Sequence, residues 1–486
     1  MSNTLANLKP ELLWKHFEEI CKRPHPSRNE KLVSEYIIDF AKKNSLDYSV
    51  DGFGNIVVRK PATPGKENLM TVAFQGHLDM VPEKNNDVKH NFDKDPIQAY
   101  VDGDWVKAKG TTLGSDNGIG VAAALAILES KDLEHGPIEA LFTLDEETGL
   151  NGAQALESGF LKADIMINLD SEEDGAFYIG CAGGQNTFAE FKIKTTPYKE
   201  NTVPLEVSIT GLKGGHSGLD IASGRGNAIK LMARLLYNLN EKFGITLSKI
   251  NGGSKHNAIP REAFALIRIP KKNYLEVLDT VSKFESAVQA ELATVEPSLQ
   301  VIAKKVQSRA KVIDKATSDK IIASLFGIQN GVIKMSADIE GLVETSSNLA
   351  VVVTKQNSVE VITSQRSSVE SEKYEISDAI AAVFKLAKAK VNFGEGYPGW
   401  KPDINSPILK IMKGVYKHMF GAEPEIKAIH AGLECGIIKE KFPHIDMISL
   451  GPTIQGAHSP DEKVQISTVQ KFWDILVNTL KAIPSK

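Results

Sequence analysis

The sequence predicts an α/β domain with a mixed, largely parallel central sheet, interrupted by an inserted α+β domain. Three observations support this fold class. Up to about residue 185, short apolar runs alternate with amphipathic helical segments, which is typical of α/β domains. From 186 to 396, strand-like segments alternate in period two, as antiparallel sheets do. From 397 the first pattern returns and continues to residue 486.

The length of the chain supports the same division. A chain of 486 residues is too long for one hydrophobic core and predicts two to three domains. We therefore predict that residues 1–185 and 397–486 form the two parts of one domain, and that residues 186–396 form the insertion.

The first part is predicted to begin with helices over residues 10–46. Ser27 is expected to be the N-cap of the second helix, with Glu30 three residues later. Strands and one buried helix then alternate. In chain order, their sequences are GNIVVRK, MTVAFQGH, the helix GIGVAAALAILES, IEALFTLDEE and ADIMINLD.

The inserted part has a different pattern. PLEVSITGL, residues 204–212, alternates in period two, and residues 224–243 have apolar side chains at helical spacing. The segments that follow are FALIRI, LEVLDTVSKFESAVQAEL, LAVVVTK and VEVITSQR, read as strand, helix, strand and strand. A cluster of glycine, proline and tryptophan at 394–403 is the predicted return linker. A helix over 407–420 and a buried strand in IDMISLGP complete the chain.

Composition excludes several classes of protein. The net charge is −4 and no basic stripe occurs, so we expect no nucleic-acid partner. The longest clean apolar run, residues 121–128, is too short to span a membrane. The N-terminal segment lacks the apolar core of a signal peptide. Three cysteines cannot form a disulfide framework, so we expect a cytoplasmic protein.

Residues of the types that bind metals follow the predicted strands. Each has an ordinary alternative, such as a turn, a helix cap or a solvated loop. Together they predict a site for two divalent metals of the zinc, cobalt or manganese type, because ligands gather outside the carboxyl ends of strands in α/β sheets. These residues are His77, Asp79, Asp116, Asp145, Glu146, Glu147, Asp170 and His458.

The motifs resemble a known superfamily. HLD at 77–79, GSDNG at 114–118, DEETG at 145–149, NLD at 168–170 and GAHSPDE at 456–462 are similar to those of the di-zinc aminoacylase and carboxypeptidase superfamily. HLDMVPEKN, GTTLGSDNGIG, GLKGGHSG, KHNAIPR and HAGLECG resemble, more closely, the bacterial cytosolic Xaa-His (aminoacyl-histidine) dipeptidases. The resemblance extends over nearly the whole chain, and it implies that the insertion is a lid and dimerisation domain.

The resemblance also implies a role for each residue of the site. His77 and Asp170 would bind one metal, Glu147 and His458 the other, and Asp116 would bridge the two. Glu146 would be the general base that takes a proton from the attacking water activated by the two metals. Asp79 would orient the imidazole of His77 through its other nitrogen.

The inserted domain and the return segment supply further candidates. In related enzymes the histidine of LKGGHSG, here His216, stabilises the oxyanion in the partner subunit's site. Asn257 and Arg366 are expected to position the substrate, since arginine binds a terminal carboxylate with two hydrogen bonds. His430 and Glu434 are expected to line the pocket for the C-terminal residue, where Glu434 would pair with an imidazole. The alternative for each is a surface, turn or loop residue.

The function that the resemblance implies is a zinc-dependent dipeptidase that hydrolyses Xaa-His dipeptides, including β-alanyl-histidine. The resemblance implies a small dipeptide as substrate and a homodimer as the assembly. Two other interpretations remain open. One keeps the metals and changes the substrate, as in a broader di- or tripeptidase or an N-acyl amino acid deacylase. The other is a non-catalytic binding protein with the same fold, which would be expected to lack Glu146 or a metal ligand.

Overall fold

The computed structural model describes residue 5 and residues 7–486. Contacts between Cα atoms divide the chain into two compact units. The first comprises Met1–Cys181, Trp400–Ala428 and Leu433–Lys486, and the second comprises Ala182–Gly399 and Ile429–Gly432. The predicted domain boundaries at 185/186 and 396/397 lie near two of these changes of unit. That the units are separate domains stays a prediction.

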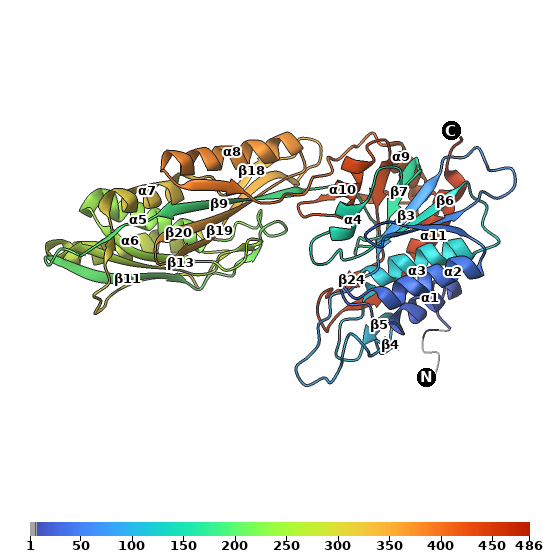
Figure 1. The fold of residues 1–486 in the computed structure, drawn as a ribbon, viewed down its shortest axis with the longest axis horizontal. Coiled ribbons are helices and arrows are strands. Elements are labelled where there is room, and N and C mark those ends of the chain that lie inside the picture. Colours follow the sequence, from blue (N-terminus) through green and yellow to red (C-terminus); the bar gives the residue numbers. More distant parts are fainter. Residues whose placement is uncertain (1–4, 6) are drawn as a thin grey trace. The chain divides into compact units, whose positions relative to one another are not determined.

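The first unit is built on an eight-stranded sheet in the order β1-β2-β6-β3-β7-β23-β8-β22. Its strands β3, β6 and β7 are labelled in Figure 1. Neighbours in the central run β6-β3-β7-β23 are parallel, whereas β1, β2 and β8 pair antiparallel. This arrangement confirms the predicted mixed sheet with a parallel centre. The strands are β1 (Asp47–Val50), β2 (Ile56–Lys60), β3 (Val72–His77), β6 (Ile138–Thr143), β7 (Ile165–Asn168), β8 (Ala176–Cys181), β22 (Glu425–Ile429) and β23 (Asp446–Ser449).

Helices pack against this sheet. Strands β3 and β6 are buried at every position, which is typical of strands covered on both faces. Helix α3 packs on β3 and on α1, and α9 packs on β23 and on α11. Among the described residues, no helix is both long and apolar enough to cross a membrane. The helices are α1 (Glu11–Cys21), α2 (Lys31–Lys43), α3 (Ser115–Glu129), α4 (Asn151–Ala155), α9 (Pro407–Phe420), α10 (Glu434–Lys441) and α11 (Ile466–Ala482).

One predicted helix start is wrong. Helix α2 begins at Lys31 with Glu30 at the N-cap, not at Ser27. The backbone of Arg28 is left-handed, with φ 71°, so the helix cannot begin before it. The Ser27 hydroxyl points instead to the carbonyl of Met80, and the Glu30 carboxylate accepts hydrogen bonds from the N–H groups of Arg28 and Asp145.

A second, four-stranded sheet in the first unit places two loops of the site. Its order is β24-β25-β5-β4, with β24 (Ile454–Gln455), β25 (Lys463–Gln465), β5 (Trp105–Ala108) and β4 (Ala99–Asp102). The β24–β25 connection carries residues 456–462, and the segment after β5 leads into α3. Because β25 pairs with β5, these two segments start from neighbouring strands although they are distant in sequence.

The second unit contains a nine-stranded antiparallel sheet in the order β16-β11-β15-β13-β19-β20-β9-β21, with β18 paired to β19. Helices cover one face of it (Figure 1). Strand β11 alternates between buried and less buried residues, and Val203, Leu205, Val207 and Ile209 join the apolar core. The sheet is antiparallel and the burial along β11 alternates in period two, as the sequence predicts.

The elements of the second unit are β9 (Gly183–Lys192), β10 (Thr195–Thr196), β11 (Thr202–Thr210), β12 (Gly215–His216), α5 (Ala228–Phe243), β13 (Thr246–Gly252), β14 (Ala258–Ile259), β15 (Ala263–Pro270), a 3-10 turn (Lys271–Asn273), α6 (Tyr274–Glu291), β16 (Gln300–Lys305), β17 (Val312–Ile313), α7 (Lys315–Gly327), β18 (Gly331–Met335), β19 (Val343–Thr354), β20 (Ser358–Ser367), α8 (Glu370–Leu386) and β21 (Lys390–Phe393).

Close packing of α3 against the central strands requires a glycine in β3. A Cβ atom on Gly76 would lie 2.2 Å from Oδ1 of Asn117. The Asn117 side chain cannot move away freely, because its Nδ2 donates a hydrogen bond of 2.7 Å to the carbonyl of Leu169. Gly76 therefore sets the distance between the end of β3 and the start of α3.

Replacing Gly76 by alanine should destabilise the protein by about 1–3 kcal/mol, because the added methyl group overpacks this contact. The free energy of unfolding, measured by urea denaturation, checks the prediction. Gly414→Ala is the matched control, since a Cβ on this α9 residue meets nothing within 4 Å. Alanine there should stabilise the helix by about 0.5–1 kcal/mol. Equal effects of the two substitutions would contradict the packing argument.

Candidate metal centre

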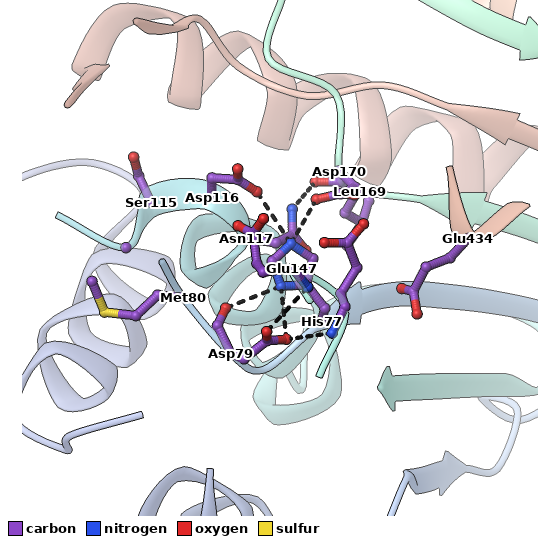
Figure 2. Close-up of polar contacts among 12 residues, drawn as sticks. His77, Asp79, Met80, Ser115, Asp116, Asn117, Glu147, Leu169, Asp170 and Glu434 are labelled. Atoms are coloured by element: carbon purple, nitrogen blue, oxygen red, sulfur yellow. Dashed lines mark hydrogen bonds and ion pairs between the residues drawn. The ribbon is translucent and has the colours of Figure 1, made fainter. Parts of the chain in front are cut away.

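The ends of the parallel strands bring most of the predicted ligands together. His77 is the last residue of β3, Glu147 follows β6, and Asp170 follows β7. These three strands are neighbours in the order β6-β3-β7. Figure 2 shows the side chains of His77, Glu147 and Asp170 converging with that of Asp116. His458 reaches the same place from the β24–β25 connection.

Asp116, at the start of α3, faces both histidines. Its Oδ1 lies 3.1 Å from Nε2 of His77, and its Oδ2 lies 3.1 Å from Nε2 of His458. Two groups of possible ligands therefore share this carboxylate. One consists of His77, Asp116 and Asp170, and the other of Asp116, Glu147 and His458, each with its ligand atoms within 4.8 Å of one another.

The donor set fits two divalent cations. Asp170 Oδ1 and Glu147 Oε1 are buried and accept no hydrogen bond from the described residues. Each nevertheless lies beside a histidine nitrogen, at 3.2 Å from His77 Nε2 and 3.0 Å from His458 Nε2. A buried carboxylate oxygen without a hydrogen-bond donor is costly unless a cation compensates it. Imidazole and carboxylate are also the ligands that zinc, cobalt and manganese accept.

The pKa shifts of the site residues indicate that the site carries an excess of negative charge. Burial disfavours charge on His77, yet the carboxylates of Asp170 and Asp116 outweigh burial and hold its pKa well above the usual value. The hydrogen bond to Asp116 and the close carboxylate of Glu147 raise the pKa of His458 to about 11. Burial and nearby acids raise the pKa of Asp170 to about 6. The site thus attracts positive charge, which metal ions would supply.

Glu146 lies beside this donor set. Its carboxylate forms a third close group with His77 and Glu147. Burial raises its pKa well above the usual value, and the negative charges of Asp170 and Glu147 add to this effect, whereas His77 opposes it. A carboxylate with a raised pKa beside a metal-binding site can accept a proton and release it again.

Asp79 contacts His77 in a way that differs in detail from the prediction. The nearest acceptor for Nδ1 of His77 is the backbone carbonyl of Asp79, at 3.0 Å, while the carboxylate oxygen Oδ1 lies at 3.4 Å. The carboxylate also accepts hydrogen bonds from the N–H groups of Glu146 and Glu147. Burial opposes its charge, but the contact with His77 and the hydrogen bond from the N–H of Glu146 lower its pKa to about 2.

The candidates His216, Asn257, Arg366 and His430 all lie in the second unit. Nδ1 of His216 accepts hydrogen bonds from the N–H groups of Gly218 and Leu219. Burial and the charge of Arg366 lower the pKa of His216. A neutral ring that accepts at Nδ1 carries its proton on Nε2, so His216 presents an N–H donor.

The neighbours of His216 form a polar cluster. Nη1 of Arg366 donates to the Tyr397 hydroxyl at 2.9 Å, and its Nε is buried and has no hydrogen-bond partner among the described residues. Nε2 of His430 lies 2.7 Å from the Ser346 hydroxyl, and burial with the charge of Arg366 lowers the His430 pKa to about 3. Asn257 is exposed, and its carbonyl accepts the N–H of Ser217.

Glu434 belongs to the first unit and is fully buried at the start of α10. Its Oε2 accepts hydrogen bonds from Gln75 at 2.6 Å and Thr143 at 2.7 Å, which are residues of β3 and β6. Its Oε1 is buried without a hydrogen-bond partner among the described residues, and burial raises its pKa to about 7. In Figure 2 it lies to one side of the converging ligands.

Sequence reasoning missed three residues that hold Asp116 in place. Asn117 anchors the start of α3 to the end of β7, and Ser115 and Glu462 bond to each other beside Asp116. Glu462 lies inside the motif GAHSPDE, so its proximity to His458 is visible in the sequence. Its contact with Ser115, which lies 347 residues earlier, is not visible in the sequence.

Comparisons with known proteins show the family of the chain. Residues 73–482 match the model of the family described as peptidase family M20/M25/M40. The chain is 44% identical over 482 residues to the cytosol non-specific dipeptidase of Escherichia coli (strain K12), covering 99% of both chains. It is 45% identical to the aminoacylhistidine dipeptidase structure from Vibrio alginolyticus, with a TM-score of 0.94 and coverage of 99% and 98%.

A more distant structure, a tripeptidase from Staphylococcus aureus, is 16% identical with a TM-score of 0.57 and covers 98% of both chains, which shows a shared fold alone. The matched model spans most of the chain, and the two relatives of 44–45% identity extend over nearly all of it. The chain therefore belongs to peptidase family M20/M25/M40 and is a peptide-bond hydrolase.

Proposed function

We propose that this hydrolase is a metal-dependent dipeptidase that prefers Xaa-His dipeptides, including β-alanyl-histidine. The observation that carries the proposal is the pair of ligand groups that share Asp116. Full-length similarity to proteins named as a cytosol non-specific dipeptidase and an aminoacylhistidine dipeptidase supports the substrate class. The first of these names also supports a cytoplasmic location, and the resemblance of the sequence motifs supports a homodimer.

The proposed metal ligands follow from the two groups. His77 and Asp170 would hold one cation, Glu147 and His458 the other, and Asp116 both. When bound, two divalent metals, most simply zinc, would polarise the scissile carbonyl and make an attacking water more acidic. Asp79 would keep the His77 ring in its orientation, with Nε2 toward Asp116, because it accepts the hydrogen bond of the other ring nitrogen.

Glu146 is the proposed general base. It lies next to the ligand Glu147, and its N–H donates to Asp79, which fixes the backbone of both glutamates. Its carboxylate would take a proton from the attacking water and pass it to the leaving amine. Its presence argues against a non-catalytic binding protein.

Substrate selection is assigned to the polar cluster of the second unit and to Glu434. The buried Arg366 has an unused Nε donor, which suits the terminal carboxylate of a dipeptide. His216 presents an N–H donor that suits a developing oxyanion. Asn257 and His430 are the other proposed contacts. The free Oε1 of Glu434 is the proposed partner of a substrate imidazole.

Replacing Glu146 by glutamine should lower kcat by roughly 10²–10⁴-fold, because the amide cannot accept the proton. Steady-state kinetics on Ala-His check this, together with the metal content of the purified variant. Glu157→Gln is the matched control, since Glu157 is an exposed residue beyond the site. A Glu146→Gln enzyme that keeps its metals and wild-type kcat would exclude Glu146 as the base.

Removing divalent metals with a chelator should abolish hydrolysis, and zinc or cobalt should restore it. The thermal midpoint should fall as well, since an ion present at 100 times its Kd stabilises the folded state by about 2.7 kcal/mol. Metal content by elemental analysis should show two ions per chain in active protein. Full activity in protein that contains no divalent metal would contradict the proposed site.

Among Ala-His, β-alanyl-histidine, Ala-Leu and an N-acetyl amino acid, the two histidine dipeptides should have the highest kcat/KM. Glu434→Gln should lower kcat/KM for Ala-His more than for Ala-Leu, because only the first substrate carries an imidazole. Equal losses would remove Glu434 as the specificity residue. Cleavage of the acetylated substrate alone would indicate a deacylase, and equal rates on many di- and tripeptides would indicate a broader peptidase.

A further inference from the structure

The carboxylate of Glu462 binds the segment that leads to Asp116. Glu462 is 2% exposed. Its Oε2 accepts hydrogen bonds from the N–H groups of Leu113 and Gly114, at 2.8 and 3.1 Å. Its Oε1 accepts from the N–H and the hydroxyl of Ser115, at 2.7 and 2.6 Å, and from the N–H of Asp116 at 3.3 Å. One side chain thus satisfies four consecutive backbone donors.

These donors belong to the turn that leads into the regular part of helix α3, because Asp116 and Asn117 have non-helical backbone angles. Gly114, with φ 72°, has no side chain that could accept from them. Buried backbone N–H groups outside a regular helix or sheet need an acceptor, and a carboxylate can accept several hydrogen bonds at once. Glu462 supplies this acceptor from a distant part of the sequence.

The same residue belongs to the loop that carries His458. The N–H of Glu462 donates to the carbonyl of Ser459 at 3.0 Å, and the N–H of Ser459 donates to the carbonyl of Gly456 at 3.1 Å. The loop from 456 to 462 is therefore folded on itself around His458. Through Glu462 it is attached to the segment that presents Asp116.

We propose that Glu462 is a positioning residue of the metal centre. It holds the backbone segments that carry the shared ligand Asp116 and the ligand His458 in a fixed position relative to each other. This inference rests on the proposed metal site. Glu462 itself is not a ligand, because both of its oxygens already accept hydrogen bonds. Its effect passes through the backbone of residues 113–116, as residues behind a ligand act on metal affinity by fixing the ligand's orientation.

The chemistry requires a carboxylate rather than an amide. Two donors face Oε2 and three face Oε1. A glutamine would direct its NH₂ group at one of these sets in either orientation, so that donors would face donors. Glu462→Gln therefore removes at least two hydrogen bonds while nearly conserving the volume of the side chain.

Titration of Co²⁺ into metal-free protein tests the proposal. The stoichiometry and Kd are measured by competition with a chromophoric chelator, and the visible absorption of bound Co²⁺ reports the ligand geometry. Four proteins are compared, namely wild type, Glu462→Gln, Ser115→Ala and Asp461→Asn. The last is the matched control, because it removes the same charge from an exposed neighbour in the same loop. The thermal midpoint of each metal-free protein is recorded in parallel.

Glu462→Gln should weaken Co²⁺ binding by roughly 10–100-fold and alter the absorption spectrum. Ser115→Ala, which removes one donor to Oε1, should weaken binding less, and Asp461→Asn should leave it unchanged. Wild-type affinity and spectrum in Glu462→Gln would overturn the proposal, even if the metal-free protein melts earlier, because Glu462 would then only stabilise the fold.

If Glu462→Gln does not fold, Ser115→Ala decides, since unchanged affinity in that variant would overturn the proposal and weakened affinity would support it. The proposed function is tested separately by wild type in the same titration. Wild-type protein that binds no Co²⁺ or Zn²⁺ would overturn the metal site and this inference with it. Equal binding by wild type and Glu462→Gln would overturn the inference alone.

Discussion

The candidate centre depends on one carboxylate that contacts two imidazoles at once. Each oxygen of Asp116 lies 3.1 Å from a different histidine nitrogen. This geometry needs the end of β3, the start of α3 and the loop that carries His458 to meet at one point. The glycine at position 76 and the Asn117–Leu169 hydrogen bond bring α3 against the central strands. Packing of the first unit thus determines where the ligands lie.

Charge is the second constraint on this unit. Two unit charges about 4 Å apart interact by about 4 kcal/mol at an effective dielectric constant of about 20. Asp116, Glu147 and Asp170 share the site with Glu146, and the close groups among the described residues contain two imidazoles, those of His77 and His458. Without cations the balance is reached by protonation, which raises the pKa of His77, His458, Asp170 and Glu146 together. Two divalent cations would compensate the same carboxylates without adding protons.

Local signals in the sequence were enough to predict much of the fold and several of the side chains that converge at the candidate centre. The apolar runs that end in His77 or lead to Asp170 are strands β3 and β7, and parallel strands bring their ends to one edge. Features set by tertiary contacts could not be predicted. The left-handed Arg28 moves the start of α2. Spacing alone could not decide between Glu146 and Glu147 as the base, because adjacent acids differ only in their surroundings.

The insertion explains why residues so far apart in sequence can build one site. Asp116 and Glu462 are 346 residues apart, yet they lie in the same unit. Cys181 and Trp400 exchange two backbone hydrogen bonds of 2.9 Å, so the chain leaves the first unit and returns to it at one place.

Once that pair forms, the effective separation falls to roughly 130 residues, which lowers the loop-closure cost by only about 0.9 kcal/mol. The pair therefore lowers the entropy cost of closing the loop only slightly. The division of residues between the two units matters more. Every proposed metal ligand, the proposed base and Glu462 belong to the first unit, whereas most proposed substrate contacts belong to the second. The proposed substrate contacts of the second unit can therefore change without altering the residues that would hold the metals.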